Sequence, residues 1–497
     1  MKFSAVAAAC LSLLSHVAVA DTSADANADA PGKSRVAVPS TFQPPQVFQN
    51  ENLVHVISLE KNYAKEFINV VIKNTSPEPQ DEYYVPFTGS QVEKLGGFEV
   101  KDKKDESLSG FTIEAVEFDS YSEVQYYRIR LPAPLPSESK QTISISFYHL
   151  NGFAPLPAAI EQSEKQYLVY TFSAYAPSVY PTLKQKTEVK LPSTDIPEYT
   201  KLPGSGKVEE FPQRQGTKLT YGPFLDIPAG AVEPARVRYE FTKPITYVSQ
   251  LERDVEVSHW GGNIAFEDRY TLHNYAANLS TQFNRVEWAR AQFYKPETTA
   301  LKELRFPLQV GSKDAYFTDV IGNVSTSRFR SNRKEALLEI KPRYPVFGGW
   351  NYPFTIGWNA NARRFLKKVT GDTFVLNVPF LEGPKQPEGI QYGQAQIRVL
   401  LPEGAENVKF HTSIPASSIT GYTIDHQKTY LDTIGRTVLT IKVRNLVDEF
   451  QNRNLIVSYD YSFIASLRKP AVIFSSMLSV FVTIWALSKV NVKISTK

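Results

Sequence analysis

The residues of this chain that could carry chemistry are few and widely spaced. Its seven histidines form no His-Glu-x-x-His pair, and its one cysteine, Cys10, lies in the leading apolar segment, so no zinc site of the usual kinds is predicted. The chain has no Gly-x-Ser-x-Gly elbow and no Asp-x-Asp pair, and the Gly-Ser-Gly-Lys run at Gly204 lacks the spacing of a phosphate loop. The sequence therefore predicts no catalytic residues, no metal ligands and no cofactor.

Charged residues cluster in a few places. Adjacent carboxylates at Glu267 and Asp268 would point to opposite faces of a strand, which favours a solvated strand end over an acid–base pair. Cations form two runs. The first comprises Arg328, Arg330, Arg333 and Lys334, and the second comprises Arg363, Arg364, Lys367 and Lys368. Either could meet phosphate, a lipid headgroup or an acidic partner, but such runs are more often solvated loops between strands. We interpret both as solvated and assign neither a ligand.

Three sequons could be modified. They begin at Asn74 (N-T-S), Asn278 (N-L-S) and Asn323 (N-V-S), and none has a proline in the middle. In a secreted chain such sequons are glycan acceptors on exposed loops. We expect two or three of them to carry glycans.

The N-terminus is typical of a secretory signal peptide. Lys2 precedes an apolar run, and Ala18-Val19-Ala20 is a small-x-small cleavage site, so residues 1–20 are predicted to be removed. The alternative, a first membrane helix, is disfavoured because the apolar core is short. Cys10 leaves with the signal peptide, so the mature chain can form no disulfide and its domains must rely on their apolar cores.

A second apolar run, residues 470–488, predicts one transmembrane helix. It contains no charge and is bracketed by Arg468-Lys469 and Lys489, and spanning a bilayer takes about 20 residues. A lipid-anchor signal is disfavoured because basic residues follow the run. The expected topology is single-pass type I, with a cytosolic tail at 489–497 and the bulk of the chain in the lumen.

One face of this helix carries small hydroxyl residues. Ser475, Ser479 and Thr483 recur every fourth residue and therefore share a face. Small hydroxyl side chains let membrane helices approach closely and hydrogen-bond across the contact. We interpret these three residues as a packing face for a partner helix.

The lumenal part is nearly neutral. The six cations in or beside the two apolar segments account for the apparent net charge of +4, and without them 49 cations face 51 anions. A balanced chain is not expected to bind nucleic acid.

Period-two alternation of apolar and polar residues predicts a mainly β chain. Residues 299–308 are the exception, predicted as a short helix that ends at Pro307. A faint repeat relates the strand at 66–74 to the strand at 266–274. It also relates the Leu-Pro pair at 191 to the pair at 401, and the valine at 237 to the valine at 457. It predicts two related β-sandwich-like domains, at 48–247 and 248–467, after a mobile lead-in at 21–47.

Several segments, in one order, resemble a known family. They are "HWGGNIAFEDRYTLHN" from His259, "DVIGNVSTSRFR" from Asp319, "LEIKPRYPVFGGWNYPFTIGWN" from Leu338, "LPEGAENVKF" from Leu401 and "YLDTIGRTV" from Tyr430. Together they resemble the ribophorin I family, subunit 1 of the oligosaccharyltransferase of the endoplasmic reticulum. The resemblance is close in the second domain and looser in the first. The tail is shorter than in animal members and looks fungal.

The resemblance implies a non-catalytic subunit in the endoplasmic reticulum membrane. Its complex transfers a glycan from dolichyl diphosphate to Asn in N-x-Ser/Thr of nascent chains, and a different, multi-spanning subunit carries the chemistry. The implied partners are the other subunits, nascent secretory polypeptides and membrane lipid. A free-standing, membrane-anchored lumenal chaperone or glycan-binding module is the alternative. On either reading, Gly348 and Gly349 are expected to form a turn between two core strands.

Overall fold

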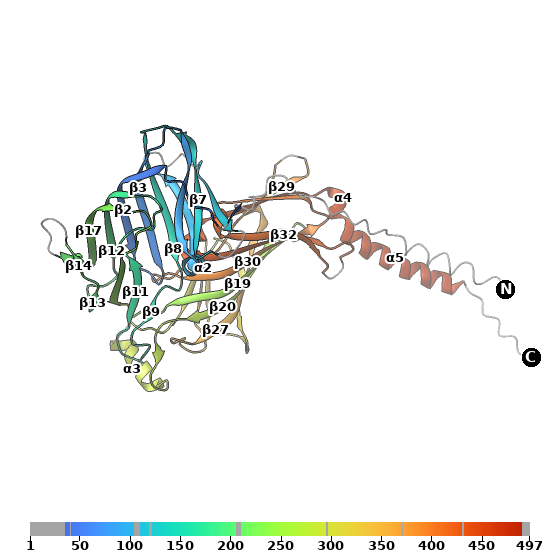
Figure 1. The fold of residues 1–497 in the computed structure, drawn as a ribbon. Helices are drawn as coiled ribbons and strands as arrows, with labels where there is room; N and C mark the ends of the chain where they lie inside the picture. Colours follow the sequence, from blue (N-terminus) through green and yellow to red (C-terminus); the bar gives the residue numbers. More distant parts are fainter. Residues whose placement is uncertain are drawn as a thin grey trace, which may run out of the picture. The chain divides into compact units, whose positions relative to one another are not determined.

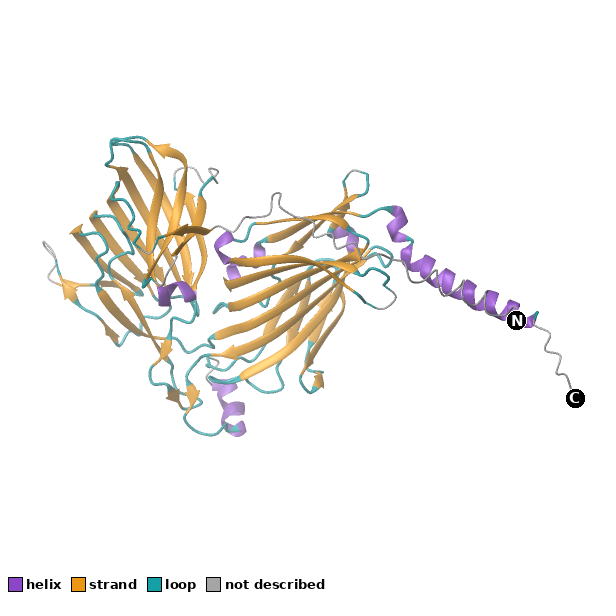
Figure 2. Cartoon of the chain, turned by 45° about the vertical axis from the view of Figure 1, so that its right-hand side comes forward, coloured by secondary structure: helices purple, strands orange, loops and turns teal. Residues whose placement is uncertain are grey.

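Strands dominate the part of the chain that the structure describes, and the one long helix in that part lies near the C-terminus, as the sequence predicts (Figures 1 and 2). The computed structural model describes residues 35–39, 41–103, 110–118, 122–204, 210–294, 297–369, 371–429 and 432–489. The predicted signal peptide and all of the predicted tail but Lys489 lie outside these ranges. The mainly β fold class is confirmed.

The first half is built on a seven-stranded sheet. Its strand order is β16-β17-β12-β2-β3-β8-β5. In that order the strands are Gln213–Gln215, Lys218–Ile227, Thr182–Lys190, Phe48–Ser58, Ala64–Asn74, Lys140–His149 and Leu95–Asp102. Figure 1 shows β12, β2, β3 and β8 running side by side in the blue and green part of the ribbon. Strands β2 and β3 are central in this sheet, and the side chains of each strand point alternately to its two faces.

Two smaller sheets cover the same face of this sheet. One has the order β1-β6-β7-β4 and the other β13-β18-β11-β9. In that order, the strands of the first sheet are Arg35–Val38, Thr112–Phe118, Val124–Leu135 and Gln80–Thr88. Those of the second are Glu198–Tyr199, Pro234–Glu240, Tyr167–Ser173 and Ala154–Pro155. On β2, Leu53 packs in the core under β4 and β7, whereas Ile57 packs in a separate core under β11 and β18. The two covering sheets therefore meet above the residues between Leu53 and Ile57.

The second half repeats this plan. Its main sheet has the order β32-β33-β30-β19-β20-β27-β23-β24, and its smaller sheets are β22-β26-β25 and β28-β29-β34-β31. The main strands are Ile419–Gln427, Arg436–Val447, Gln391–Glu403, Thr246–Ser258, Asn263–Asn274, Asn351–Asn361, Lys313–Asp319 and Gly322–Asn323. The smaller sheets comprise Leu304–Leu308, Ala336–Ile340 and Arg328–Ser331, and then Leu366–Lys368, Thr373–Pro379, Asn454–Asp460 and Glu406–Thr412.

The two halves share their connectivity as well as their strand order. Strands β17, β12, β2, β3, β8 and β5 occupy the places of β33, β30, β19, β20, β27 and β23. In each half the first long strand pairs antiparallel with the next and parallel with a much later one. Both β2 and β19 carry a bulge at the same distance from the start of the strand, at Asn50/Asn52 and Val248/Gln250. We propose that the halves arose by duplication, and the predicted boundary after Tyr247 falls at the start of β19.

The remaining elements are short. They are β10 (Ala159–Ile160), β14 (Leu202–Pro203), β15 (Glu210–Phe211), β21 (Asn278–Leu279), α2 (Gly89–Lys94), α3 (Arg285–Tyr294), α4 (Phe463–Ser466) and the 3-10 turns η1 (Ala362–Arg364), η2 (Ala416–Ser418) and η3 (Asp448–Asn452). Helix α5 (Arg468–Ser488) is long and apolar enough to cross a membrane, and no part of it is buried within the protein.

The described residues belong to one compact unit, so the two halves are in contact. The Tyr63 hydroxyl donates to Asp448 Oδ1 at 2.6 Å, and Lys65 pairs with Glu449 at 2.5 Å. Tyr148 packs edge-on against Phe450 with ring centroids 5.6 Å apart. This contact couples the β3 and β8 ends of the first half to η3 of the second.

Two local predictions were wrong. Residues 304–308 form strand β22, not a helix, because Leu304, Phe306 and Leu308 alternate into the core while β22 pairs with β26. The predicted mobile lead-in also extends too far. Strand β1 pairs with β6, and Val38, Phe42 and Val47 pack against the first core.

Candidate functional site

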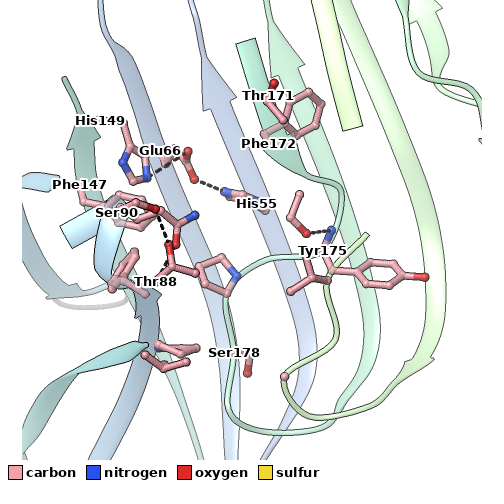
Figure 3. A pocket seen from close by; sticks show the side chains of 18 of the residues that line it. His55, Glu66, Thr88, Ser90, Phe147, His149, Thr171, Phe172, Tyr175 and Ser178 are labelled. Carbon is pink, nitrogen blue, oxygen red and sulfur yellow. Dashed lines mark hydrogen bonds and ion pairs between the residues drawn. The ribbon is translucent and has the colours of Figure 1, made fainter. Parts of the chain in front are cut away.

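A cavity of about 560 Å³ lies where the two covering sheets of the first half meet (Figure 3). Its floor is formed by the main sheet, through His55 on β2, Glu66 on β3, and Phe147 and His149 on β8. Its walls come from β4 and α2 on one side and from β11 on the other. This volume is in the range of sites that hold a small ligand or a short stretch of a larger one.

The polar floor follows from strand alternation. His55 lies between Leu53 and Ile57 on the inward face of β2, and Glu66 lies between Ala64 and Ile68 on the inward face of β3. The flanking apolar residues fill the two cores, while the polar pair lies under the seam between the covering sheets. Glutamate is rarely buried unless it is paired, so Glu66 requires partners at this position.

Glu66 has three such partners. His55 Nε2 lies 2.7 Å from Glu66 Oε2, the Tyr170 hydroxyl donates to Oε1 at 2.9 Å, and His149 Nε2 lies 3.6 Å from Oε1. Burial would raise the pKa of Glu66, but the His55 hydrogen bond, the nearby His149 and the Tyr170 hydroxyl outweigh it and lower the pKa to about 2. Burial also lowers the pKa of His149. Glu66 is therefore a carboxylate that accepts hydrogen bonds from the surrounding rings.

His55 is left with one free nitrogen. Because Glu66 is ionised, we assign the proton of the His55 Nε2 to the hydrogen bond with Glu66. The other ring nitrogen, Nδ1, is buried and has no hydrogen-bond partner among the described residues. In the neutral ring this atom is an acceptor.

The His–Glu pair is accompanied by neither a hydroxyl on Nδ1 nor a metal-ligand group among the described residues. A His–Glu pair can orient a general base, but a nucleophile would have to contact the free Nδ1, and no described hydroxyl does so. Within the part of the chain that the structure describes, no three His, Cys, Asp or Glu side chains are grouped to hold a metal ion. The site therefore combines a polar floor with walls of mixed polar and apolar side chains.

The matching position in the second half is filled. By strand register, Arg253 takes the place of His55, Phe266 that of Glu66, and Trp358 that of Phe147. The Phe266 and Trp358 rings stack 5.3 Å apart, and the Arg253 guanidinium lies over both, 5.2 and 5.7 Å from their centroids. The same fold thus closes this position with rings in one half and leaves a cavity in the other.

The closed position also corrects an interpretation made from the sequence. Asp268 and Glu267 are not at a solvated strand end, since both lie within β20 and Asp268 is fully buried. Arg253 pairs with Asp268 and with Glu382, each at 2.7 Å. Burial raises the pKa of Asp268 to about 6, and Arg253 limits the rise. Alternation did place the two carboxylates on opposite faces.

The predicted acceptor Asn74 lies in the core. Its side chain is fully buried at the end of β3, and Nδ2 donates to the carbonyls of Glu78 and Leu135, both at 2.8 Å. Its Oδ1 accepts from the Ser76 N–H at 2.8 Å. Because Nδ2 is the atom that would carry a glycan, this placement argues against the expected modification.

The other two sequons lie on the surface. Asn278 is exposed in β21, and Asn323 is exposed in β24. Gly348 and Gly349 form the expected turn before β27 beside Asn278, and only Gly349 has a positive φ, 77°. At Gly348 a Cβ atom would lie 2.0 Å from the Ala277 carbonyl oxygen, so close approach requires glycine there.

The predicted packing face lies on α5. Ser475, Ser479 and Thr483 are exposed, and each hydroxyl donates to a carbonyl within the helix. The face is open to a partner, and its packing role stays a prediction. Both cationic runs are also exposed. Arg330 pairs with Glu339 at 3.2 Å, which is consistent with a solvated strand surface.

Sequence reasoning missed the cavity, although a signal was present. Glu66 is in phase with Ile68, Val70 and Ile72, which alternation assigns to the buried face. A charged residue in a buried phase indicates either an internal pair or a site. The sequence does not show which of these applies, because that depends on the seam between the covering sheets.

The chain is similar to one set of known proteins. A family model described as Ribophorin I matches residues 48–488. Over 430 residues the chain is 31% identical to the dolichyl-diphosphooligosaccharide--protein glycosyltransferase subunit 1 of Schizosaccharomyces pombe, covering 86% of this chain and 92% of that protein. It is 27% identical to subunit 1B of Arabidopsis thaliana, covering 92% and 96%. Subunit 1 of Caenorhabditis elegans is 32% identical over 74% of this chain, which spans 61% of the length of the worm protein.

Proposed function

The chain belongs to the ribophorin I family, and from that premise we propose that it is a non-catalytic subunit of the oligosaccharyltransferase complex. It supports the transfer of a glycan from dolichyl diphosphate to Asn of N-x-Ser/Thr by scaffolding the complex and presenting acceptor chains. The observation that carries the proposal is the family match over residues 48–488, together with relatives that are named subunit 1 of that glycosyltransferase.

The chemistry of the described residues supports the non-catalytic part. Glycan transfer to an amide nitrogen needs electrostatic stabilisation of a diphosphate leaving group, for which a metal ion held by carboxylates is well suited. No metal-binding group of His, Cys, Asp or Glu is found in the described ranges. A subunit that only holds the acceptor can still lower the barrier, because positioning contributes up to about 7–11 kcal/mol at the extreme.

The proposed location is the endoplasmic reticulum membrane, in a type I orientation. Helix α5 supplies the single span, and its N-terminal end carries Arg468 and Lys469. Residues 21–467 would then lie in the lumen, where the exposed Asn278 and Asn323 can be glycosylated. The partners would be the other subunits, including the multi-spanning catalytic one, along with nascent secretory chains and membrane lipid.

Reconstitution tests this function. The purified chain, the complex with it and the complex without it are each given lipid-linked glycan and an N-x-Thr peptide, and transfer is measured. We expect no transfer by the chain alone and a large loss of transfer when the complex lacks it. Turnover by the chain alone would refute the non-catalytic role.

The cavity favours a second candidate, a free-standing lumenal chaperone or glycan-binding module anchored by α5. This candidate predicts that the complex keeps full activity without the chain. It also predicts that purification in mild detergent recovers the chain without the other subunits.

A further inference from the structure

One wall of the cavity is an unpaired strand edge. Strand β11 pairs along its whole length with β18, but on its other side β9 pairs only with Leu168 and Val169. Residues 170–173 of β11 therefore have one side without a strand partner among the described residues, and all four line the cavity. An edge of this kind is a template for an added strand.

The backbone groups on this edge can be assigned. The Tyr167 carbonyl accepts from Leu156, on the β9 side, whereas the Ala174 N–H donates to Glu233, on the β18 side. Because the two sides alternate along an antiparallel strand, the N–H and C=O groups of Thr171 and Ser173 point to the open side. Four backbone groups thus have no strand partner among the described residues.

The facing wall is less suited to strand addition. Strand β4 is also an edge, since it pairs only with β7 among the described strands. It carries Pro86 beside the cavity, and proline has no N–H to donate. The edge of β11 has no proline between residues 167 and 173.

The floor lies within reach of a strand added to β11. Packed sheets are about 10 Å apart, so an inward side chain of an added strand would point to the floor at His55 and Glu66. His55 and Glu66 line the cavity there, and the Nδ1 of His55 is buried without a partner among the described residues. The rings of Phe87, Phe147 and Phe172 line the cavity around it and would contact an apolar neighbour on the same strand.

We propose that this cavity binds an extended polypeptide segment, which adds as a strand to β11 at Thr171 and Ser173 and turns alternate side chains toward the floor at His55 and Glu66. The inference deepens the proposed function and rests on it, since the segment would belong to an acceptor chain presented to the complex. A free strand edge specifies a polypeptide, because main-chain pairing is the interaction that it offers.

The second half provides an internal comparison. Its strand β29 corresponds to β11. Asn377 corresponds to Thr171, because the residues before them, Leu376 and Tyr170, pair with the matching valines Val457 and Val237. There the edge is closed, because the Asn377 N–H donates to the Phe365 carbonyl at 2.8 Å and the Phe365 ring packs on Phe266. Both Thr171 and Asn377 have exposed side chains, so they make a matched pair for experiment.

The test uses the cysteine-free mature chain. Thr171→Cys and Asn377→Cys are each introduced into the full-length protein, assembled in microsomes with its partners. The probe is a stalled nascent polypeptide with one cysteine in an unfolded segment, and disulfide cross-links are counted under mild oxidation. We expect the Thr171→Cys variant to cross-link at least ten times more than the Asn377→Cys variant. Equal yields from the two variants, or no cross-link from Thr171→Cys, would overturn the inference.

A second variant tests the strand pairing itself. Thr171→Pro removes the outward N–H and leaves the pairing with β18 intact, so cross-linking through Ser173→Cys should fall about five-fold, the effect of one hydrogen bond. An unchanged yield would overturn strand addition. If free oligomannose protects the Thr171→Cys thiol from alkylation and no nascent chain cross-links to that thiol, the proposal of a polypeptide ligand is overturned and a glycan is the ligand instead. Loss of co-purifying subunits from the unsubstituted chain would refute the proposed function instead.

Discussion

Replacing Asn74 with alanine should destabilise the first half without removing a glycan. The side chain joins three backbone groups: Nδ2 donates to Glu78 and Leu135, and Oδ1 accepts from Ser76. The bond to Leu135 is fully buried, so its loss should cost about 1–3 kcal/mol, whereas the two partly buried bonds should cost about 1 kcal/mol each. We expect a total loss of about 3–5 kcal/mol in the free energy of unfolding.

Two matched variants separate the hydrogen bonds from the sequon. Ser76→Ala removes the sequon but keeps Asn74, and the Ser76 hydroxyl makes only an exposed bond with the Glu78 N–H and a 3.4 Å contact with Gln80. Asn274→Ala removes the corresponding side chain of the second half, which donates to Thr299 and Val346 and belongs to no sequon. Asn274→Ala should therefore be as destabilising as Asn74→Ala, and Ser76→Ala should be nearly neutral.

The assay combines urea unfolding with gel mobility before and after glycosidase treatment. Variants at position 74 or 76 should keep the mobility of the parent, whereas Asn278→Gln and Asn323→Gln should each remove one glycan. A mobility shift in Ser76→Ala would refute the reasoning. It would show that the Asn74 side chain leaves the core in the mature protein and is available to the transferase.

Three further predictions concern the floor, the helix and the topology. Because the pKa of Glu66 is lowered to about 2, its contribution to the free energy of unfolding is complete above pH 4.5 and is lost as the pH falls from 4.5 towards 2. Melting temperatures measured over that interval should therefore fall less steeply for Glu66→Gln than for the parent. Replacing the three hydroxyl residues of the α5 face with leucine should reduce co-purification of the partner subunits several-fold, since each interhelical hydrogen bond contributes about 0.6 kcal/mol or more; equal recovery would indicate a lipid-facing stripe. Protease added to sealed microsomes should remove no more than the segment after Lys489, and digestion of residues 21–467 would contradict the proposed orientation.

Alternation predicted more of this fold than any motif did. It located β3 and β20, and the repeat that it suggested aligns strands that have the same place in the two halves. Alternation also predicts that Asn74 is buried, because Asn74 is in phase with the buried Ile68, Val70 and Ile72. The sequon rule reads three residues and ignores that phase, whereas strand pairing buries every second residue.

The failed helix at residues 299–308 has a related cause. Leu301, Leu304 and Leu308 are spaced as on a helix, but Leu304, Phe306 and Leu308 are spaced as on a strand. Pairing with β26 decides between the two patterns, and the partner strand lies some thirty residues away. Short apolar runs with both periods cannot be assigned from the sequence alone.

The cavity was beyond prediction because it depends on how two covering sheets meet. An unpaired buried nitrogen does not identify a site by itself, since Trp358 Nε1 in the closed half also lacks a partner among the described residues. In the first half the unpaired Nδ1 of His55 coincides with a cavity and with four backbone groups on β11 that have no strand partner among the described residues. In the second half the corresponding space holds stacked rings and the corresponding edge is bonded to Phe365. Since one fold supports both arrangements, the open one is not a requirement of the architecture, and this is the reason for assigning it a ligand.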